Sequence, residues 1–318
     1  MIEKENYLLT GATGLIGSAL LRKLVADDNS VSCPIRNKGK AKGLFDGEIY
    51  NKVQWIELPL EKYLQEADEH FDYIIHCASP TSGKYMVEHP VETYEFIIES
   101  TRALLQYACK HKVKGMVYVS SLEYYGQNFN EDIITEDFEG YIEPTSPRSS
   151  YPLGKRAAEY LCVAYASEYK VPVKIARLTQ TFGPGITADD NRVFAQFARS
   201  VINKEDIILH TDGESAKPYC HVYDCVYAIL TILDKGNLGE AYNVANEETY
   251  ITIRDMAEFV QKNFNPEHKV VIQKRDDMGY APVTKLRLCT NKLKDLGWTP
   301  RYGLHDMYDA LIKEIKRN

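Results

Sequence analysis

The chain lacks the cysteine patterns that are typical of small secreted domains or of metal-binding sites. Its seven cysteines are an odd number, lie scattered along the chain and include no C-x-x-C pair. They occupy positions 33, 77, 109, 162, 220, 225 and 289. This distribution argues against a disulfide framework and against a zinc site. We therefore expect buried thiols and no bound metal.

Long apolar runs and basic tracts are also missing. No apolar stretch approaches the length needed to span a membrane, and the charged residues 3–5 lead directly into the first apolar run, with no room for a signal peptide. The net charge of −7 and the pI near 5.7 argue against a nucleic-acid-binding surface. We expect a cytoplasmic protein with neither a membrane nor a nucleic-acid partner.

The composition that remains is that of a globular protein large enough for a cofactor domain and a substrate-binding region. Strands are predicted at 7–9, 31–35, 53–58, 73–77, 115–120 and 172–178, most of them separated by helical patterns. This alternation predicts an α/β fold with a Rossmann-type, doubly wound parallel sheet. Later elements, including a strand at 242–244, are shorter and mixed. We expect a dinucleotide-binding domain over 1–178 and a smaller C-terminal substrate-binding lobe over 179–318, with some chain crossing between them.

The segment from Thr10 to Gly17 reads T-G-A-T-G-L-I-G and joins the first predicted strand to an amphipathic helix. Gly11 can adopt the dihedral angles of the turn, Gly14 lets the backbone approach a pyrophosphate, and Gly17 lets the helix pack closely on the strand. The helix N-terminus then presents free N–H groups to phosphate. The turn residues expected at the cofactor are Gly11, Thr13, Gly14, Leu15, Ile16 and Gly17.

A second motif, Tyr-x-x-x-Lys, consists of Tyr151 and Lys155 on a predicted helix. Four residues are about one helical turn, so both side chains lie on one face. A phenol with a pKa near 10 is a poor base at neutral pH, but an adjacent ammonium and a positively charged nicotinamide favour the phenolate. The phenolate can take a proton from a carbinol as hydride leaves. The segment 120–126, after the fifth strand, adds serines and a carboxylate at the same sheet edge.

Together these motifs resemble the extended short-chain dehydrogenases/reductases, specifically the NAD-dependent epimerase/dehydratase family, over nearly the whole chain. The resemblance implies that Ser121 hydrogen-bonds the reacting oxygen and that Tyr151 is the general acid or base. Lys155 would lower the pKa of Tyr151 and bind the nicotinamide ribose. Glu123 matches the second acid/base of nucleotide-sugar dehydratases and decarboxylases, and Ala78 is expected at the cofactor.

Within this family, residues 78–86, 154–156 and 189–194 resemble stretches of the UDP-glucuronate decarboxylases. The resemblance implies that Arg192, Lys217 and Arg275 lie near the phosphates or sugar of the substrate. Lys217 stands where the family usually has arginine, which replaces a bidentate phosphate contact with a point charge. The family commonly dimerises through two helices, so the helices at 88–111 and 151–169 are expected to form a homodimer surface.

The chain departs from the family at the end of the second strand, where an NAD enzyme of this build usually carries Asp or Glu. Arg36 stands there, and lysines follow at 38, 40 and 42. Their positive field attracts a 2′-phosphate, which favours NADP(H), with NAD(H) still possible. Two further departures are Pro59, in place of an acidic residue, and Gln180, in place of asparagine.

We therefore expect an NAD(P)-dependent enzyme that modifies a nucleotide-activated sugar by hydride transfer at a carbinol or ketone, in the epimerase, dehydratase or decarboxylase class. Arg36 favours an alternative, the net NADPH-dependent reduction of a nucleotide-linked keto sugar. A small-carbonyl reductase is a further alternative, against which the phosphate-directed cations count. A non-catalytic cofactor-binding relative is the last, disfavoured because Ser121, Tyr151 and Lys155 are all present.

Overall fold

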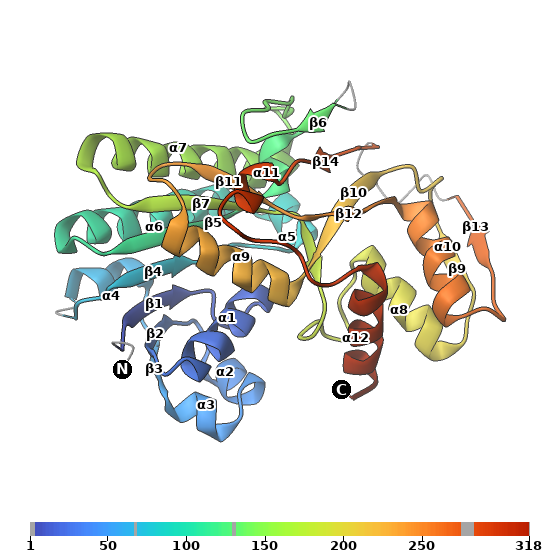
Figure 1. Ribbon diagram of the computed structural model, residues 1–318, viewed down its shortest axis with the longest axis horizontal. Coiled ribbons are helices and arrows are strands. Elements are labelled where there is room, and N and C mark those ends of the chain that lie inside the picture. Colours follow the sequence, from blue (N-terminus) through green and yellow to red (C-terminus); the bar gives the residue numbers. More distant parts are fainter. Residues whose placement is uncertain (1–3, 67–68, 129–131, 275–282, 318) are drawn as a thin grey trace.

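The computed structural model describes residues 4–66, 69–128, 132–274 and 283–317. Its central sheet has seven parallel strands in the order β11-β7-β5-β4-β1-β2-β3 (Figure 1). The strands are β1 Asn6–Thr10, β2 Ser30–Pro34, β3 Val53–Ile56, β4 Tyr73–His76, β5 Gly115–Ser121, β7 Val173–Leu178 and β11 Ala241–Val244. The chain builds outward from β1 in both directions, so the predicted doubly wound sheet is confirmed, with its switch point between β1 and β4.

Helices cover both faces of this sheet and form two apolar clusters with it. The helices α1 Leu15–Ala26 and α9 Val222–Lys235 contribute to the cluster on one face. The helices α4 Leu60–Glu66, α6 Pro90–His111 and α7 Ser150–Tyr169 contribute to the cluster on the other. Short helices α2 Lys38–Leu44, α3 Gly47–Asn51 and α5 Gly83–Glu88 lie in the connections. Burial on both faces explains why the strands are nearly continuous in apolar residues.

Most of the chain after residue 178 forms a second, smaller group of elements around its own apolar cluster. A mixed sheet contains β8 Gln180–Phe182, β10 Ala216–His221 and β12 Asn246–Thr252, and two-stranded pairs join β9 Ile207–Leu209 with β13 Val270–Ile272 and β6 Ile133–Ile134 with β14 Arg287–Leu288. The helices there are α8 Val193–Asn203, α10 Ile253–Phe264 and α12 Leu304–Arg317, whereas α11 Asn291–Lys294 contacts β11 and contributes Leu293 to an apolar cluster of the central sheet. In Figure 1 β9, β10, β12, β13, α8, α10 and α12 lie at one end of the molecule.

One strand lies elsewhere than the sequence pattern suggested. The strand predicted at 242–244 is β11, and it pairs with β7 at the edge of the central sheet. Helix α9 also packs with that sheet, so the chain returns to it after entering the smaller lobe. A periodicity of apolar residues reports that a strand is buried, not which sheet it joins, and this is why the assignment failed. The division near residue 178 stays a proposal.

Three helices end in the same unusual way. The helices α6, α7 and α8 terminate at Lys112, Lys170 and Lys204, whose φ angles are 51°, 58° and 56°. This left-handed conformation closes a helix but is usually adopted by glycine.

The described residues contain no helix long and apolar enough to cross a membrane, and no cluster of three metal-ligating side chains. All seven cysteines are free thiols, and Cys33, Cys162, Cys220 and Cys225 are buried.

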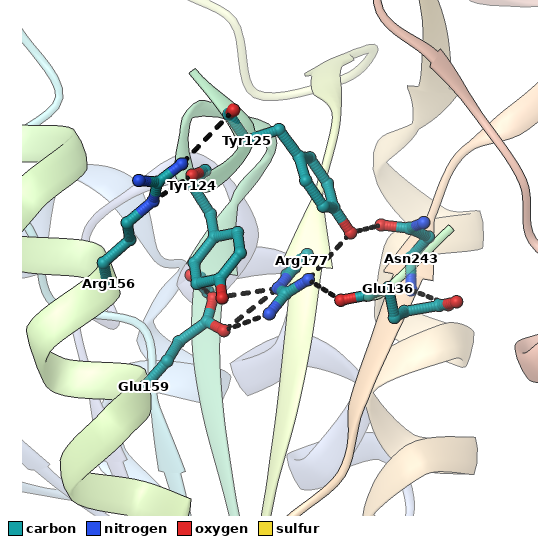
Figure 2. A network of polar contacts seen from close by, with 8 residues as sticks. Tyr124, Tyr125, Glu136, Arg156, Glu159, Arg177 and Asn243 are labelled. Atoms are coloured by element: carbon teal, nitrogen blue, oxygen red, sulfur yellow. Dashed lines mark hydrogen bonds and ion pairs between the residues drawn. The ribbon is translucent and has the colours of Figure 1, made fainter. Parts of the chain in front are cut away.

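A buried ion pair connects α7 to the central sheet (Figure 2). Arg177 on β7 donates from Nη2 to Glu159 Oε2 at 2.7 Å and from Nε at 3.0 Å, and the two side chains are only 5% and 3% exposed. The hydroxyl of Ser120, on β5, donates to the same carboxylate. The guanidinium carbon lies 3.5 Å from the centre of the Tyr124 ring. The pair therefore joins β5, β7, α7 and the 3-10 helix η1 Leu122–Tyr125.

The remaining donor nitrogen of this guanidinium extends the network toward the sheet edge. Arg177 Nη1 donates to the Tyr125 hydroxyl at 2.9 Å and to the Glu136 carbonyl at 2.6 Å. Tyr125 in turn donates to Asn243 Oδ1, on β11, at 2.6 Å (Figure 2). Each of the three guanidinium nitrogens of Arg177 donates to an acceptor, and these hydrogen bonds offset the cost of burying its charge.

We expect Glu159→Ala to lower the free energy of unfolding by about 3–5 kcal/mol, because it leaves the Arg177 charge buried without a partner. Urea denaturation followed by circular dichroism measures the change. Lys313→Ala, which removes an exposed ion pair with Asp309 on α12, is the control and should change stability little. Equal stability of the two variants would contradict this account.

Candidate active site

The glycine turn after β1 is shaped by two close approaches of backbone. Gly11 has φ +74°, and a Cβ placed on it would lie 2.7 Å from the Ala78 amide nitrogen. A Cβ on Gly17 would lie 2.1 Å from the Gly11 carbonyl oxygen. Neither position accepts a side chain without movement of the main chain. At the point where β1 meets α1, the main chain of the turn is therefore not covered by side chains of these two residues.

The N-terminus of α1 lacks a side-chain cap among the described residues. Gly14 is its N-cap, no side chain caps it, and no acidic residue lies in its first turn. The backbone N–H groups of the first turn, which begins with Leu15 and Ile16, follow Thr13 and Gly14 directly. Such a terminus attracts anions through free donors and the helix dipole. The cradle fits the pyrophosphate of a dinucleotide.

A buried polar network fixes the β4 side of this turn. The Ala78 amide donates to Thr10 Oγ1 at 3.2 Å, and Thr10 Oγ1 lies 2.7 Å from His76 Nδ1. Ser100 donates its own proton to a main-chain carbonyl of α6, so it accepts from His76 Nε2, at 3.3 Å. His76 thus carries its proton on Nε2. Burial, with a contribution from Lys155, lowers the pKa of His76 to about 3, so the imidazole is neutral.

The proposed proton-transfer residue, Tyr151, lies in the first turn of α7 and is 8% exposed. Burial raises the pKa of its phenol, and the Glu123 carboxylate raises it further. The hydroxyls of Ser121 and Ser79 and the charge of Arg148 act in the opposite direction. The structure therefore brings Ser121, Glu123 and Tyr151 together.

Lys155 lies one turn further along α7 and is fully enclosed. Its ammonium donates to the Val119 carbonyl at 2.9 Å and lies 4.7 Å from the centre of the Tyr118 ring. Burial lowers the pKa of Lys155 to about 8, against the opposing charge of Glu159. The expected lowering of the Tyr151 pKa is not found in the protein alone, because desolvation of the phenol dominates. A cationic nicotinamide beside the phenol would supply a further opposing charge.

Glu123 is held from two sides. Its amide donates to Ser121 Oγ at 3.2 Å, which caps η1. Both of its carboxylate oxygens accept from Arg148 Nη2, at 2.9 and 2.8 Å. Arg148 belongs to the 3-10 helix η2 Pro147–Ser149, immediately before α7. The sequence analysis missed this residue, although its place three positions before Tyr151 was a signal that it lies at the site.

The three cations expected on the substrate side behave differently. Burial lowers the pKa of Lys217, on β10, and the Glu123 charge opposes this, so Lys217 is near enough to Glu123 for their charges to interact. Arg192 is 43% exposed and its Nε contacts both oxygens of Asp190, at 3.0 and 3.1 Å. Its charge is already matched by a carboxylate. Arg275 lies outside the described residues.

The end of β2 carries both signs of charge. Arg36 is exposed there, as expected, but the amide of Lys38 donates to Glu57 Oε1 at 3.1 Å. Glu57 follows β3, and the pairing of Pro34 with Ile56 brings the two strand ends side by side. A carboxylate therefore lies beside the end of β2, although β2 itself supplies none. Sequence inspection of β2 alone could not find it.

A phosphate cradle at the switch point of a parallel sheet, with Tyr-x-x-x-Lys at the same edge, defines the class of extended short-chain dehydrogenases/reductases. The sequence model of the NAD dependent epimerase/dehydratase family matches residues 7–245, so the chain belongs to that family. The predictions of the family and of an NAD(P)-dependent enzyme are confirmed.

Similar proteins cover almost the whole chain. UDP-glucuronic acid decarboxylase 4 of Arabidopsis thaliana is 27% identical, over 98% of this chain and 69% of its own length, and UDP-glucuronic acid decarboxylase 1 of Danio rerio is 27% identical, over 99% and 73%. Among solved structures, UDP-glucose 4-epimerase of Thermotoga maritima has a TM-score of 0.85 at 22% identity, covering 98% of this chain and 99% of its own. UDP-glucuronic acid 4-epimerase of Bacillus cereus, in complex with UDP-glucuronic acid and NAD, has a TM-score of 0.79 at 22% identity, with the same coverage. The two structures establish the shared fold.

The neutral His76 predicts a pH dependence of stability. In the unfolded chain a histidine binds its proton near pH 6.5, whereas folded His76 does so near pH 3, so stability falls as pH drops through this interval. Between pH 7.5 and pH 5 this histidine should account for a loss of about 2 kcal/mol. His221, whose pKa burial lowers to about 4, adds a loss of nearly the same size in the same direction.

Urea denaturation at the two pH values tests this prediction. His76→Asn should unfold more easily at pH 7.5 but lose less stability on acidification than the wild type. His70→Asn, at an exposed position, is the control and should keep the wild-type difference. An unchanged difference in His76→Asn would show that the network does not hold a neutral imidazole.

Proposed function

We propose that the protein oxidises a nucleotide-activated sugar at a carbinol carbon, transforms the resulting keto sugar, and retains its nicotinamide cofactor through the cycle. The observation that carries the proposal is the meeting of Ser121, Glu123 and Tyr151 at one site beside Lys155. Relatives named as UDP-glucuronic acid decarboxylases cover nearly the whole chain. Their name supports UDP-glucuronate as the first substrate to test.

The residues of this chain handle the proton in that reaction. When bound, the nicotinamide supplies the acceptor for hydride. The Tyr151 phenolate takes the carbinol proton and later returns it, while Ser121, whose hydroxyl interacts with the phenol, hydrogen-bonds the same substrate oxygen. The buried ammonium of Lys155 keeps a positive charge next to the cofactor pocket.

Glu123 supports a reaction beyond simple oxidation. UDP-glucuronate oxidised at carbon 4 has its ketone β to its carboxylate, and β-keto acids lose CO2 to leave an enolate that must be protonated. A second acid/base near the phenol would serve this step. The two cations around Glu123, Arg148 and Lys217, leave an excess of positive charge, which favours a substrate that is itself an anion.

We also propose that the adenosine pocket accepts NADP(H). Arg36 is exposed at the end of β2, so a 2′-phosphate would meet its guanidinium. The first amides of the short helix α2, which follows, are already paired with Glu57 and Asn37. Glu57 opposes this preference, because its carboxylate accepts the Lys38 amide at the start of that helix. The balance of these two charges decides between the cofactors.

A homodimer and a cytoplasmic location are further parts of the proposal. Val91 and Tyr94 on α6 and Tyr160 and Val163 on α7 are exposed apolar or aromatic side chains on two neighbouring helices (Figure 1). Such a face is typical of a surface that a second subunit covers. The seven free thiols favour a reducing compartment.

Incubation of the holoenzyme with UDP-glucuronate tests the proposed reaction. The wild type should release CO2 and form a UDP-pentose, identified by mass spectrometry. Tyr151→Phe should reduce turnover by a factor of about 10² or more, because the proton acceptor is lost, while cofactor binding survives. Glu123→Gln should still reduce the bound nicotinamide but should form the UDP-pentose much more slowly, because the enolate loses the group that serves its protonation.

Tyr169→Phe, which changes an exposed tyrosine at the far end of α7, is the control and should keep wild-type turnover. Near-normal activity of Tyr151→Phe would refute the site. Stoichiometric consumption of NADPH with a nucleotide-linked keto sugar, without reaction of UDP-glucuronate, would establish the reductase alternative instead.

The cofactor preference has its own test. We expect Arg36→Ala to weaken NADPH binding relative to NADH by about tenfold or more, which corresponds to about 1.4 kcal/mol. Glu57→Gln should shift the ratio the other way, because it removes the opposing carboxylate. Nicotinamide fluorescence titration of protein stripped of nucleotide gives the two dissociation constants of the wild type and of each variant. An unchanged ratio in Arg36→Ala would mean that Arg36 does not contact a 2′-phosphate.

A further inference from the structure

Two short 3-10 helices flank Tyr151 and are connected by one ion pair. The helix η1 carries Glu123, and η2 carries Arg148 and leads directly into α7. A single nitrogen, Arg148 Nη2, donates to both oxygens of the Glu123 carboxylate, at 2.9 and 2.8 Å. Both side chains are partly exposed, at 41% and 32%, although Arg148 Nη1 is itself buried and has no hydrogen-bond partner among the described residues.

The groups that face the phenol come from several elements. Glu123 on η1 is the only carboxylate among the groups that act most strongly on Tyr151, and it opposes formation of phenolate. Ser121, Ser79 and Arg148 favour the phenolate. Two other cations belong to the same neighbourhood. Lys155 lies on α7 itself and Lys217 on β10, and each interacts with the Glu123 charge.

In a site with this composition two negatively charged groups lie close together and repel each other. The proposed reaction needs a carboxylate near the substrate and a phenolate beside it, and each makes the other harder to form. An uncompensated like charge at close range raises the pKa of an acid by about one or more. A cation placed on the carboxylate reduces this effect at the phenol.

We propose that Arg148 is a positioning residue for proton transfer: its ion pair fixes Glu123 and offsets part of the field of that carboxylate at the Tyr151 phenol. The inference deepens the proposed function, on which it rests, because it assigns a role to a residue of the same site. Arg148 acts through Glu123 and exchanges no proton itself.

If Arg148 acts through Glu123, single and double variants of these two residues should change the pKa of Tyr151 in different ways. Arg148→Gln exposes Tyr151 to an unpaired carboxylate and should raise the pKa of the phenol. Glu123→Gln removes that carboxylate and should lower it. The double variant, Arg148→Gln with Glu123→Gln, has neither charge and should lose the rise in pKa that Arg148→Gln causes alone. Arg148→Lys keeps a cation and should rescue most of the effect.

The experiment places a fluorinated tyrosine at position 151, whose lower intrinsic pKa brings the titration into the range where the protein stays folded. Fluorine NMR of the NAD⁺-bound protein then follows this one residue as pH is raised, without any substrate. Arg148→Gln should reduce the phenolate fraction at a given pH by about tenfold, a change of about one in pKa. Lys313→Gln, which breaks a distant ion pair on α12, should leave the titration unchanged.

Two results would overturn the inference. One is a titration of Arg148→Gln that matches the wild type. The other is a double variant that behaves like Arg148→Gln, because the effect would then not pass through Glu123. Urea denaturation of each variant checks that it is folded, and Arg148→Lys supplies a second comparison if Arg148→Gln is not. Failure of the proposed function is seen separately, as a wild type that titrates as expected but does not convert UDP-glucuronate.

Discussion

The ion pair between Arg177 and Glu159 is the interaction on which the geometry of the site depends. Tyr151, Lys155 and Glu159 follow one another at intervals of one helical turn, so they form a single stripe on α7. Glu159 ties the inner end of this stripe to β7 and, through Ser120, to β5. The same guanidinium lies against Tyr124 in η1, the helix that carries Glu123. One buried contact thus sets the helix and the loop that together present the reacting groups.

Burial, rather than proximity of opposite charges, sets the resting state of the site. It raises the pKa of Tyr151 and lowers those of Lys155 and His76, so each group is pushed toward its neutral form. A pocket of this kind favours a ligand that brings charge with it. The nucleotide cofactor and an anionic substrate both do so, which links recognition of the ligand to activation of the phenol.

Local spacing predicted the features that depend on neighbours in sequence. The glycine turn, the parallel sheet, and the sharing of one helix face by Tyr151 and Lys155 all follow from periods of two, three or four residues. Contacts between strands and loops far apart in the chain could not be predicted in this way. Glu57 reaches the end of β2 through the pairing of β2 with β3. The position of β11 depends on the same kind of long-range pairing.

The lysines that end α6, α7 and α8 show how a surface position balances two opposing requirements. A left-handed backbone costs a residue with a side chain about 1–2 kcal/mol, which glycine avoids. A positive charge at a helix C-terminus recovers about 0.3–1 kcal/mol through the helix dipole. The favourable interaction with the helix dipole therefore offsets only part of the backbone strain at Lys112, Lys170 and Lys204. In an acidic protein with a net charge of −7, these three exposed lysines are therefore cations whose role is to stabilise helix ends and not to bind a ligand.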